Sequence, residues 1–177
     1  MKFLKKVDIS FIVVSYNYQD YIEECINSCL KQEYSDLTFE VIVINDGSTD
    51  NTKFILKKLN DIRLKKFTIK NSGVEIASNF GFKESSGKYI VRVDADDTLE
   101  PNFLSEIGKI LKMNYAFYYS DYRIINEKSE FISNVYLPEF EVSEIFKRGD
   151  FLATGTIYRR NIIQEIGLAP TKAKNLK

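Results

Sequence analysis

The sequence predicts an α/β fold, a three-layer α/β/α arrangement with a mostly parallel central sheet. Continuous apolar, β-branched runs of strand length occur at residues 9–15, 39–45 and 88–93, as expected of strands buried on both faces. Segments with apolar residues at helical spacing separate these runs, an alternation typical of parallel sheets with crossover helices. With 177 residues, 44% of them hydrophobic, the chain suffices for one domain with a substantial core.

The first part of the chain, to about residue 112, alternates regularly. A helix over 20–31 is expected after the first strand, with an apolar face formed by Ile22, Cys25, Ile26, Cys29 and Leu30. After the second strand, Asp46-Gly47-Ser48 forms a turn, and Asp50 or Ser48 is expected to cap the next helix.

The alternation continues with a short strand over 64–69, then a glycine-bearing loop and helix over 71–86 that ends at Gly87. Pro101 suits the first turn of a further helix, whose inward residues are Phe103, Leu104, Ile107, Ile110 and Leu111. The second part is less regular. We expect strands at 115–119, 131–135 and 154–158, and helices at 141–147 and 160–166.

Composition excludes several classes of function. Formal net charge is zero, which argues against nucleic-acid binding, because that needs a dominant basic face. The absence of histidine excludes imidazole bases and leaves carboxylates, tyrosine or lysine for acid–base chemistry. Cys25 and Cys29, four apart on one helix, are interpreted as small buried residues in a reducing compartment rather than a redox or metal pair.

The location predicted from the sequence is cytoplasmic. The apolar runs are shorter than the roughly 20 residues that span a bilayer, and no signal peptide is visible. Lysines near both ends either contact an anionic membrane surface peripherally, at its inner face, or are solvated: Lys2, Lys5, Lys6, Lys172, Lys174 and Lys177.

Polar clusters directly follow three of the predicted strands. They are Ser15-Tyr16-Asn17, Asp46-Gly47-Ser48 and Asp94-Ala95-Asp96-Asp97. Ligands of open α/β sheets bind at the carboxyl ends of the strands, although each cluster alone is also explained by turn chemistry.

The acidic cluster carries its own signal. Asp94 and Asp96 point the same way in extended backbone, and such hard oxygen ligands suit Mg²⁺ or Mn²⁺. The alternative is that Asp96 or Asp97 caps the helix near Pro101. Neither a Walker A loop nor a GxGxxG motif is present, so phosphates are expected to be held by metal.

Taken together, these motifs resemble the family 2 glycosyltransferases of GT-A fold. The resemblance rests on VVSYN at 13–17, EVIVINDGSTD at 40–50, NSG at 71–73 with Asn79, and GKYI at 87–90 leading to DADD at 94–97. It covers about residues 7–168. It implies a single GT-A domain with a nucleotide-sugar-binding part at about 7–112, a partial acceptor-side part at about 113–168 and a tail at 169–177.

The resemblance also implies roles for individual residues. Tyr16 stacks on the nucleobase, usually uracil, and Asp46 accepts a hydrogen bond from it. Asp94 lies near the ribose and the metal waters, Asp96 binds Mn²⁺ or Mg²⁺ directly, and Asp97 faces the sugar or the acceptor. The same nucleotide-sugar pocket includes Ser15, Asn17, Ser48, Asn79 and Ala95.

The implied reaction transfers a sugar, with inversion, from a UDP-sugar to a hydroxyl of a glycan or lipid-linked acceptor. A metal stabilises the leaving diphosphate and a carboxylate base takes the acceptor proton. A sugar nucleotidyltransferase is disfavoured because its glycine-rich N-terminal loop is absent, and a receiver-type signalling domain does not fit DADD at the fourth strand.

This sequence departs from the family pattern in two places. Ser78 stands where the family often has arginine, and no acid follows Leu168, where the general base is usually found. The remaining candidate bases are Asp97, Asp121 and Asp150. The chain is therefore interpreted as a short transferase with an unusual base, as a truncated nucleotide-sugar-binding module with little transfer activity, or as a chain that a partner completes. A homodimer is expected to cover the apolar second half.

Overall fold

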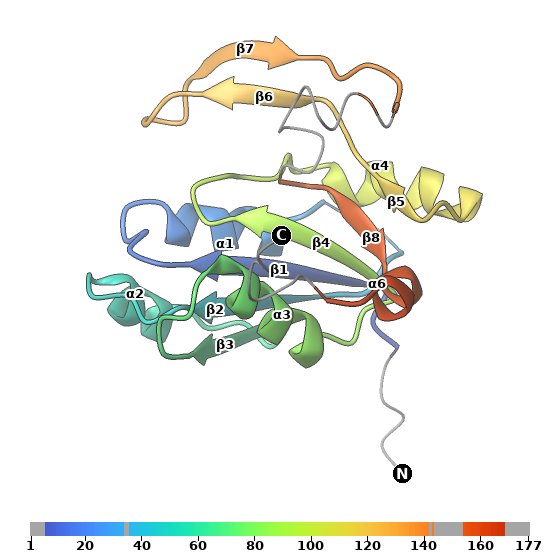
Figure 1. Cartoon of the computed structure of the whole chain (residues 1–177). Helices are drawn as coiled ribbons and strands as arrows, with labels where there is room; N and C mark the ends of the chain where they lie inside the picture. The colour runs from blue at the N-terminus through green and yellow to red at the C-terminus, as the bar shows by residue number, and fades with distance from the viewer. Residues whose placement is uncertain (1–5, 34–35, 142, 144–153, 169–177) are drawn as a thin grey trace, which may run out of the picture.

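In the computed structural model, which describes residues 6–33, 36–141, 143 and 154–168, the main sheet has six strands. Their order is β3-β2-β1-β4-β8-β5 (Figure 1). The central strands β1 (Ile9–Ser15), β2 (Phe39–Asn45), β3 (Leu64–Thr68) and β4 (Tyr89–Asp94) are parallel. Short β8 (Ile157–Arg159) runs antiparallel to both β4 and β5 (Phe117–Tyr118). The predicted mostly parallel α/β fold is confirmed.

Helices cover both faces of this sheet, as the two core clusters show. Inward residues of α1 (Ile22–Leu30), α2 (Thr52–Lys58) and α4 (Phe103–Ile110) pack against one face, with Phe11 and Val43 at its centre. Helices α3 (Val74–Glu84) and α6 (Arg160–Ile166) pack against the other, over Ile12, Ile42 and Ile44. A short 3-10 turn (Leu111–Met113) follows α4.

Cys25 and Cys29 are buried and unbridged. The pKa of the Cys25 thiol is well above its ordinary value, first because of its hydrogen bond with Cys29 and then because of burial. These properties agree with the interpretation of both cysteines as packing residues.

The amino ends of the strands are tied together by one buried carboxylate. Glu40 Oε1 accepts hydrogen bonds from Ser10 Oγ at 2.7 Å, Ser86 N at 2.6 Å and Ser86 Oγ at 2.8 Å. Its Oε2 pairs with Lys65 Nζ at 2.7 Å. The pKa of Glu40 is lowered, because these hydrogen bonds outweigh desolvation, the largest single cause. This network lies at the end of the sheet opposite the acidic cluster.

The second half differs from the sequence prediction in three places. The strand expected at 115–119 is limited to Phe117–Tyr118 (β5), because its one partner strand among the described residues is the three-residue β8. The strand expected at 154–158 begins later, at Ile157, since Gly155 has a positive φ of 85°. A strand that was not predicted, β6 (Tyr122–Ile125), forms a separate antiparallel hairpin with β7 (Phe131–Val135) (Figure 1).

Several predictions fall outside the described residues: most of the helix at 141–147, Asp150, and the terminal lysines other than Lys6. Within the described ranges, none of the helices has the length and apolar character needed to cross a membrane.

Candidate functional site

The three polar clusters meet at one edge of the sheet, as predicted from the strand ends. Parallel pairing places Ser15 beside Asn45, the residue before Asp46, and places Val14 beside Asp94. Tyr16 follows immediately and is 44% exposed. An aromatic ring, a buried carboxylate and an acidic loop therefore line the carboxyl edge of β1, β2 and β4.

Asp46 is buried beneath the start of α3. Its Oδ1 accepts a hydrogen bond from Ser72 N and its Oδ2 accepts one from Gly73 N, both at 2.9 Å. A carboxylate at this position satisfies free N–H groups at the start of the helix and complements the helix dipole. Each oxygen retains a further lone pair for a ligand donor.

The residue after Asp46 must be glycine. Gly47 has φ of 72°, and a Cβ there would lie 2.6 Å from the backbone nitrogen of Asn71. Both the left-handed conformation and the close approach exclude a side chain. The turn can therefore bring Asp46 close against the loop that begins α3.

Asn17 and Ser48 join two loops. Ser48 Oγ accepts a hydrogen bond from Asn17 N at 3.0 Å, and Asn17 Oδ1 accepts one from Thr49 N at 2.8 Å. Ser48 thus does not cap α2, whereas Asp50 Oδ1 accepts a hydrogen bond from Thr52 N at 2.9 Å, at the first residue of that helix. Ser15 is buried, and its Oγ has no hydrogen-bond partner among the described residues.

The three acids of the cluster lie in different environments. Asp94 Oδ1 accepts hydrogen bonds from Arg92 Nη2 at 2.7 Å and from Arg92 Nε at 3.1 Å. Asp97 Oδ2 accepts one from Thr154 Oγ1, and that hydroxyl also accepts one from Asp94 N at 2.9 Å. Asp96 is exposed and forms no hydrogen bond with any residue that the structure describes.

Neither Asp96 nor Asp97 caps the following helix. Helix α4 begins at Phe103 after Asn102, whose side chain makes no capping hydrogen bond, and the N–H of Leu104 in its first turn donates to Gln32 Oε1 at 2.9 Å. The alternative explanation of the acidic cluster as a helix cap is therefore wrong, because the chain makes a separate turn, with Asp97 N donating to Asp94 O at 3.0 Å.

Burial and the neighbouring charges raise the affinity of Asp97 for a proton. The pKa of Asp97 is raised, first by desolvation and then by the charges of Asp96 and Asp94, against the opposing hydrogen bond from Thr154. The pKa of the Tyr18 phenol is also raised, chiefly by the charge of Asp96. Such a concentration of negative charge favours binding of a cation.

The acidic loop suits a divalent metal ion that is bound jointly by protein carboxylates and by the substrate. No group of three His, Cys, Asp or Glu residues in the described part of the chain converges as a preformed metal site. Magnesium is usually bound by one or two carboxylates together with substrate phosphates and waters. The exposed carboxylate of Asp96 and the unshared oxygen of Asp94 suit that mode.

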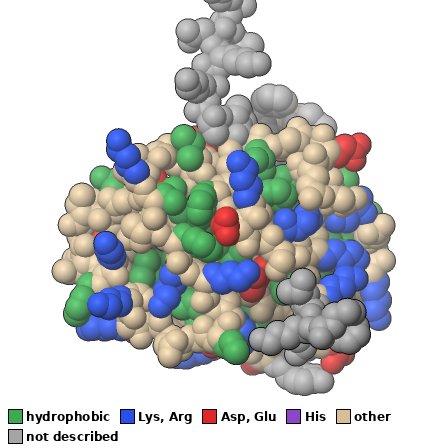
Figure 2. Space-filling model, turned by 90° about the horizontal axis from the view of Figure 1, so that it is seen from below, with side chains coloured by type: hydrophobic (Ala, Val, Ile, Leu, Met, Phe, Trp, Pro, Cys, Tyr) green, Lys and Arg blue, Asp and Glu red, His purple; other side chains and the backbone are tan. Residues whose placement is uncertain are grey.

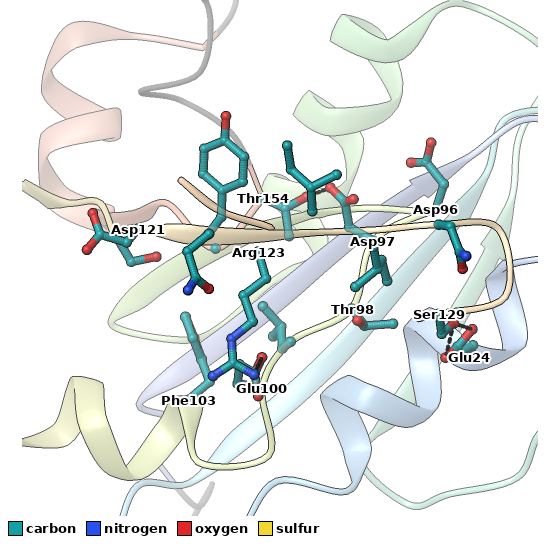
Figure 3. Close-up of a pocket in the computed structure, with 18 of the residues that line it drawn as sticks. Glu24, Asp96, Asp97, Thr98, Glu100, Phe103, Asp121, Arg123, Ser129 and Thr154 are labelled. Carbon is teal, nitrogen blue, oxygen red and sulfur yellow. Dashed lines mark hydrogen bonds and ion pairs between the residues drawn. The ribbon is translucent and has the colours of Figure 1, made fainter. Parts of the chain in front are cut away.

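A large cavity opens beside the acidic loop, between α1, the loop and the β6–β7 hairpin (Figure 3). Its volume is about 790 Å³, within the range of small-molecule sites. The hairpin is held over it by Ser129 Oγ, which donates to Glu24 Oε1 at 2.8 Å, and by the ion pair of Arg123 with Glu100 at 3.2 Å. Aromatic rings contribute to the walls: Tyr21, Phe103, Tyr122 and Tyr136.

The charged side chains in the described lining of this large cavity are mostly acidic. They are Glu24, Asp96, Asp97, Glu100, Asp121 and Glu127, against a single base, Arg123. By contrast, the face seen from below in Figure 2 shows scattered Lys and Arg side chains, with fewer acids and with hydrophobic side chains near its centre. The zero net charge of the chain thus conceals an uneven distribution.

The other site residues predicted from the sequence occupy varied positions. Asp121 lines the large cavity, where its Oδ1 accepts a hydrogen bond from Leu137 N at 2.8 Å. Asn79 and Ser78 instead line a smaller cavity of about 330 Å³ on the α3 face. Ala95 is buried in the core as a whole residue.

Sequence reasoning missed three residues of the site: Tyr18, Arg92 and Thr154. Arg92 could have been found, because residues two apart on a strand share a face and Arg92 precedes Asp94 by two. Tyr18 directly follows the polar cluster Ser15-Tyr16-Asn17. Thr154 carried no signal, since its contacts join segments about 60 residues apart.

Comparison with known proteins decides the family. The family model described as "Glycosyl transferase family 2" matches residues 10–167. The chain belongs to glycosyl transferase family 2. Its central sheet is the Rossmann-like sheet of the GT-A fold. The resemblance to this family that the sequence motifs indicated is therefore confirmed.

Relatives with assigned names include a chondroitin synthase of Pasteurella multocida, 37% identical over 137 residues, or 75% of this chain and 14% of that protein. Another is the Escherichia coli UDP-Glc:alpha-D-GlcNAc-diphosphoundecaprenol beta-1,3-glucosyltransferase WfgD, 38% identical over 68% of this chain and 48% of that protein. The family 2 chain thus spans about half or less of the length of these relatives.

Solved structures agree with the family assignment. TarS 1-349 of S. aureus in complex with UDP superposes with a TM-score of 0.78 and 26% identity, over 96% of this chain and 52% of that one. A Pyrobaculum calidifontis mannosyltransferase with GDP-Man and Mn2+ has a TM-score of 0.70 at 18% identity, over 96% of this chain and 49% of that one. The second likeness supports the fold alone.

Proposed function

We propose that this family 2 glycosyltransferase binds a UDP-sugar across the carboxyl edge of β1, β2 and β4 and transfers the sugar, with inversion, to an acceptor hydroxyl. One observation carries the proposal: Tyr16, Asp46 and the acidic loop, which are far apart in sequence, converge at that edge. The complex of TarS with UDP and the UDP-glucose donor in the name of WfgD support uridine as the nucleoside.

Each part of the donor meets a matching group of the chain. The exposed ring of Tyr16 offers a stacking surface for the base, and Asp46, held rigidly by the start of α3, offers acceptors for its N–H. Asp94 and Asp96 would hold Mn²⁺ or Mg²⁺. When bound, the metal supplies Lewis-acid stabilisation of the negative charge on the leaving diphosphate.

The acceptor is proposed to occupy the cavity of about 790 Å³ beside the acidic loop. Its carboxylates accept hydrogen bonds from sugar hydroxyls, and its aromatic rings provide apolar walls. A glycan or lipid-linked acceptor agrees with the names of the relatives. Such an acceptor also fits the predicted peripheral contact with the inner face of a membrane.

The alternative function is a nucleotide-sugar-binding module with little transfer activity. Among the candidate bases that the structure describes, Asp121 Oδ1 accepts a hydrogen bond from Leu137 N and Asp97 Oδ2 accepts one from Thr154 Oγ1, and the second oxygen of each carboxylate can still take a proton. A radiolabelled-sugar transfer assay with metal separates turnover from binding alone.

The donor site is tested by calorimetric titration with UDP, with and without Mn²⁺, of the wild-type protein and of Asp96→Ala. We expect Mn²⁺ to strengthen UDP binding in the wild type and to have no effect in Asp96→Ala. Asp20→Ala is the control, because Asp20 is exposed and contacts no other described residue through hydrogen bonds or ion pairs. An absence of UDP binding to the wild type in both conditions refutes the proposal.

A further inference from the structure

Arg92 is a cation in the middle of an otherwise apolar strand. Ile90, Arg92 and Asp94 point toward the α3 face because alternate residues of a strand share a face. Ile90 is buried there, whereas the Arg92 side chain is 44% exposed. Its stem lines the smaller cavity with Ser78 and Asn79, and its guanidinium turns toward Asp94 at the carboxyl edge. Packing of β4 alone does not require a charge here.

The ion pair of Arg92 with Asp94 uses only one of the two carboxylate oxygens. Both contacting nitrogens approach the same oxygen, Oδ1, rather than one nitrogen meeting each carboxylate oxygen. Both side chains are partly exposed, at 44% and 35%, and such pairs are weak. A diphosphate offers the paired oxygens that a guanidinium binds in a two-pronged manner. The arginine can therefore exchange partners at little cost.

We propose that Arg92 neutralises Asp94 in the empty site and turns to the diphosphate when the donor binds, which releases the carboxylate for the metal. This inference rests on the proposed donor site. Among the described residues, Arg92 is the cation that forms an ion pair with the three-acid loop. Without it, the negative charges of Asp94, Asp96 and Asp97 would oppose an incoming diphosphate.

Such an exchange couples the binding of metal and nucleotide. In the empty site Arg92 competes with the metal for Asp94, so it weakens metal binding. In the presence of nucleotide the arginine is engaged by phosphate and no longer competes. By thermodynamic reciprocity, the metal strengthens nucleotide binding by the same factor. Arg92 is therefore a positioning residue that makes the metal bind mainly together with the donor.

The experiment measures the affinity of Arg92→Gln for Mn²⁺ without nucleotide and its affinity for UDP, the latter both with and without Mn²⁺. We expect Mn²⁺ alone to bind about two- to fivefold tighter, the change that a half-exposed ion pair supports. We expect UDP without metal to bind about tenfold weaker, because a charge-assisted contact with phosphate is lost. Arg92→Lys keeps the charge without the fork and should lie between the wild type and Arg92→Gln.

The matched control is Arg63→Gln. Arg63 also pairs with an acid two residues away, Asp61, at 2.8 Å and with 38% exposure, but on the loop before β3. The affinities of Arg63→Gln for Mn²⁺ and for UDP should equal those of the wild type.

The outcomes separate the two proposals. If wild-type protein binds UDP but Arg92→Gln changes neither affinity, or binds Mn²⁺ alone more weakly, the exchange is wrong and the donor site stands. If wild-type protein binds no UDP, the donor site fails and the exchange with it. Circular dichroism establishes that each variant is folded, and Arg92→Lys provides the second test should Arg92→Gln not fold.

Discussion

The carboxylate of Asp46 allows a test that separates its structural role from its proposed contact with the nucleobase. In Asp46→Asn one oxygen becomes an NH₂ group, which then faces a backbone N–H at the start of α3, where both present contacts are 2.9 Å long. One charge-assisted hydrogen bond is lost and one partly buried N–H is left without its acceptor. Together with the lost charge near the helix N-terminus, the cost is about 2–4 kcal/mol.

A loss of that size is measurable without any ligand. For a chain of this length it corresponds to a decrease in Tm of roughly 5–15 °C. We expect thermal unfolding of unliganded Asp46→Asn, followed by circular dichroism, to show that decrease, and exposed Asp20→Asn to show none. If unliganded Asp46→Asn melts within one degree of the wild type, Asp46 does not hold the start of α3. The variant would then report on ligand contact alone.

Two further predictions concern carboxylates away from the edge. Glu40→Ala removes the acceptor of the buried network and should cost about 3–5 kcal/mol in urea denaturation; a cost below 1 kcal/mol would contradict the proposed role of Glu40 in tying the strands together. Arg63 lowers the pKa of Asp61 from 3.8 to about 2 through hydrogen bonds. The stabilisation is therefore complete above the unfolded-state pKa of 3.8 and is lost as the pH falls toward 2. Because both side chains are partly exposed, Asp61→Asn should cost under ~1 kcal/mol at pH 7. Chemical denaturation at pH 7 and pH 2 should show this difference become much smaller at pH 2. An undiminished difference at pH 2 argues against the ion pair.

The first half of the fold was predictable because its signals are local. The predicted bounds of the first two strands equal those of β1 and β2, since an unbroken apolar run specifies a buried strand. The meeting of Tyr16, Asp46 and Asp94 at one edge followed from parallel topology alone. Each of these inferences needed only a stretch of sequence and one rule about sheets.

The second half was less predictable because its elements depend on distant partners. Strand β6 contains Arg123 between apolar residues and forms only by pairing with β7. The extent of β5 is determined by the three residues of β8. The hydroxyl of Thr154 contacts Asp94 and Asp97 of the acidic loop, although the β6–β7 hairpin lies between these residues in the sequence. No local pattern reports such contacts.

The position of β8 has a consequence for synthesis of the chain. Strand β8 lies between β4 and β5, and β8 is the one strand in the described part of the chain with which β5 pairs. On the ribosome, β1 to β4 can assemble while the outer edge of β4 still exposes unpaired N–H and C=O groups. That edge stays open until Ile157–Arg159 has left the exit tunnel, and Thr154, which joins the two ends of the acidic loop, emerges only just before it. The donor edge is therefore completed only after residues 154–159 have been made, although most of its residues are made far earlier.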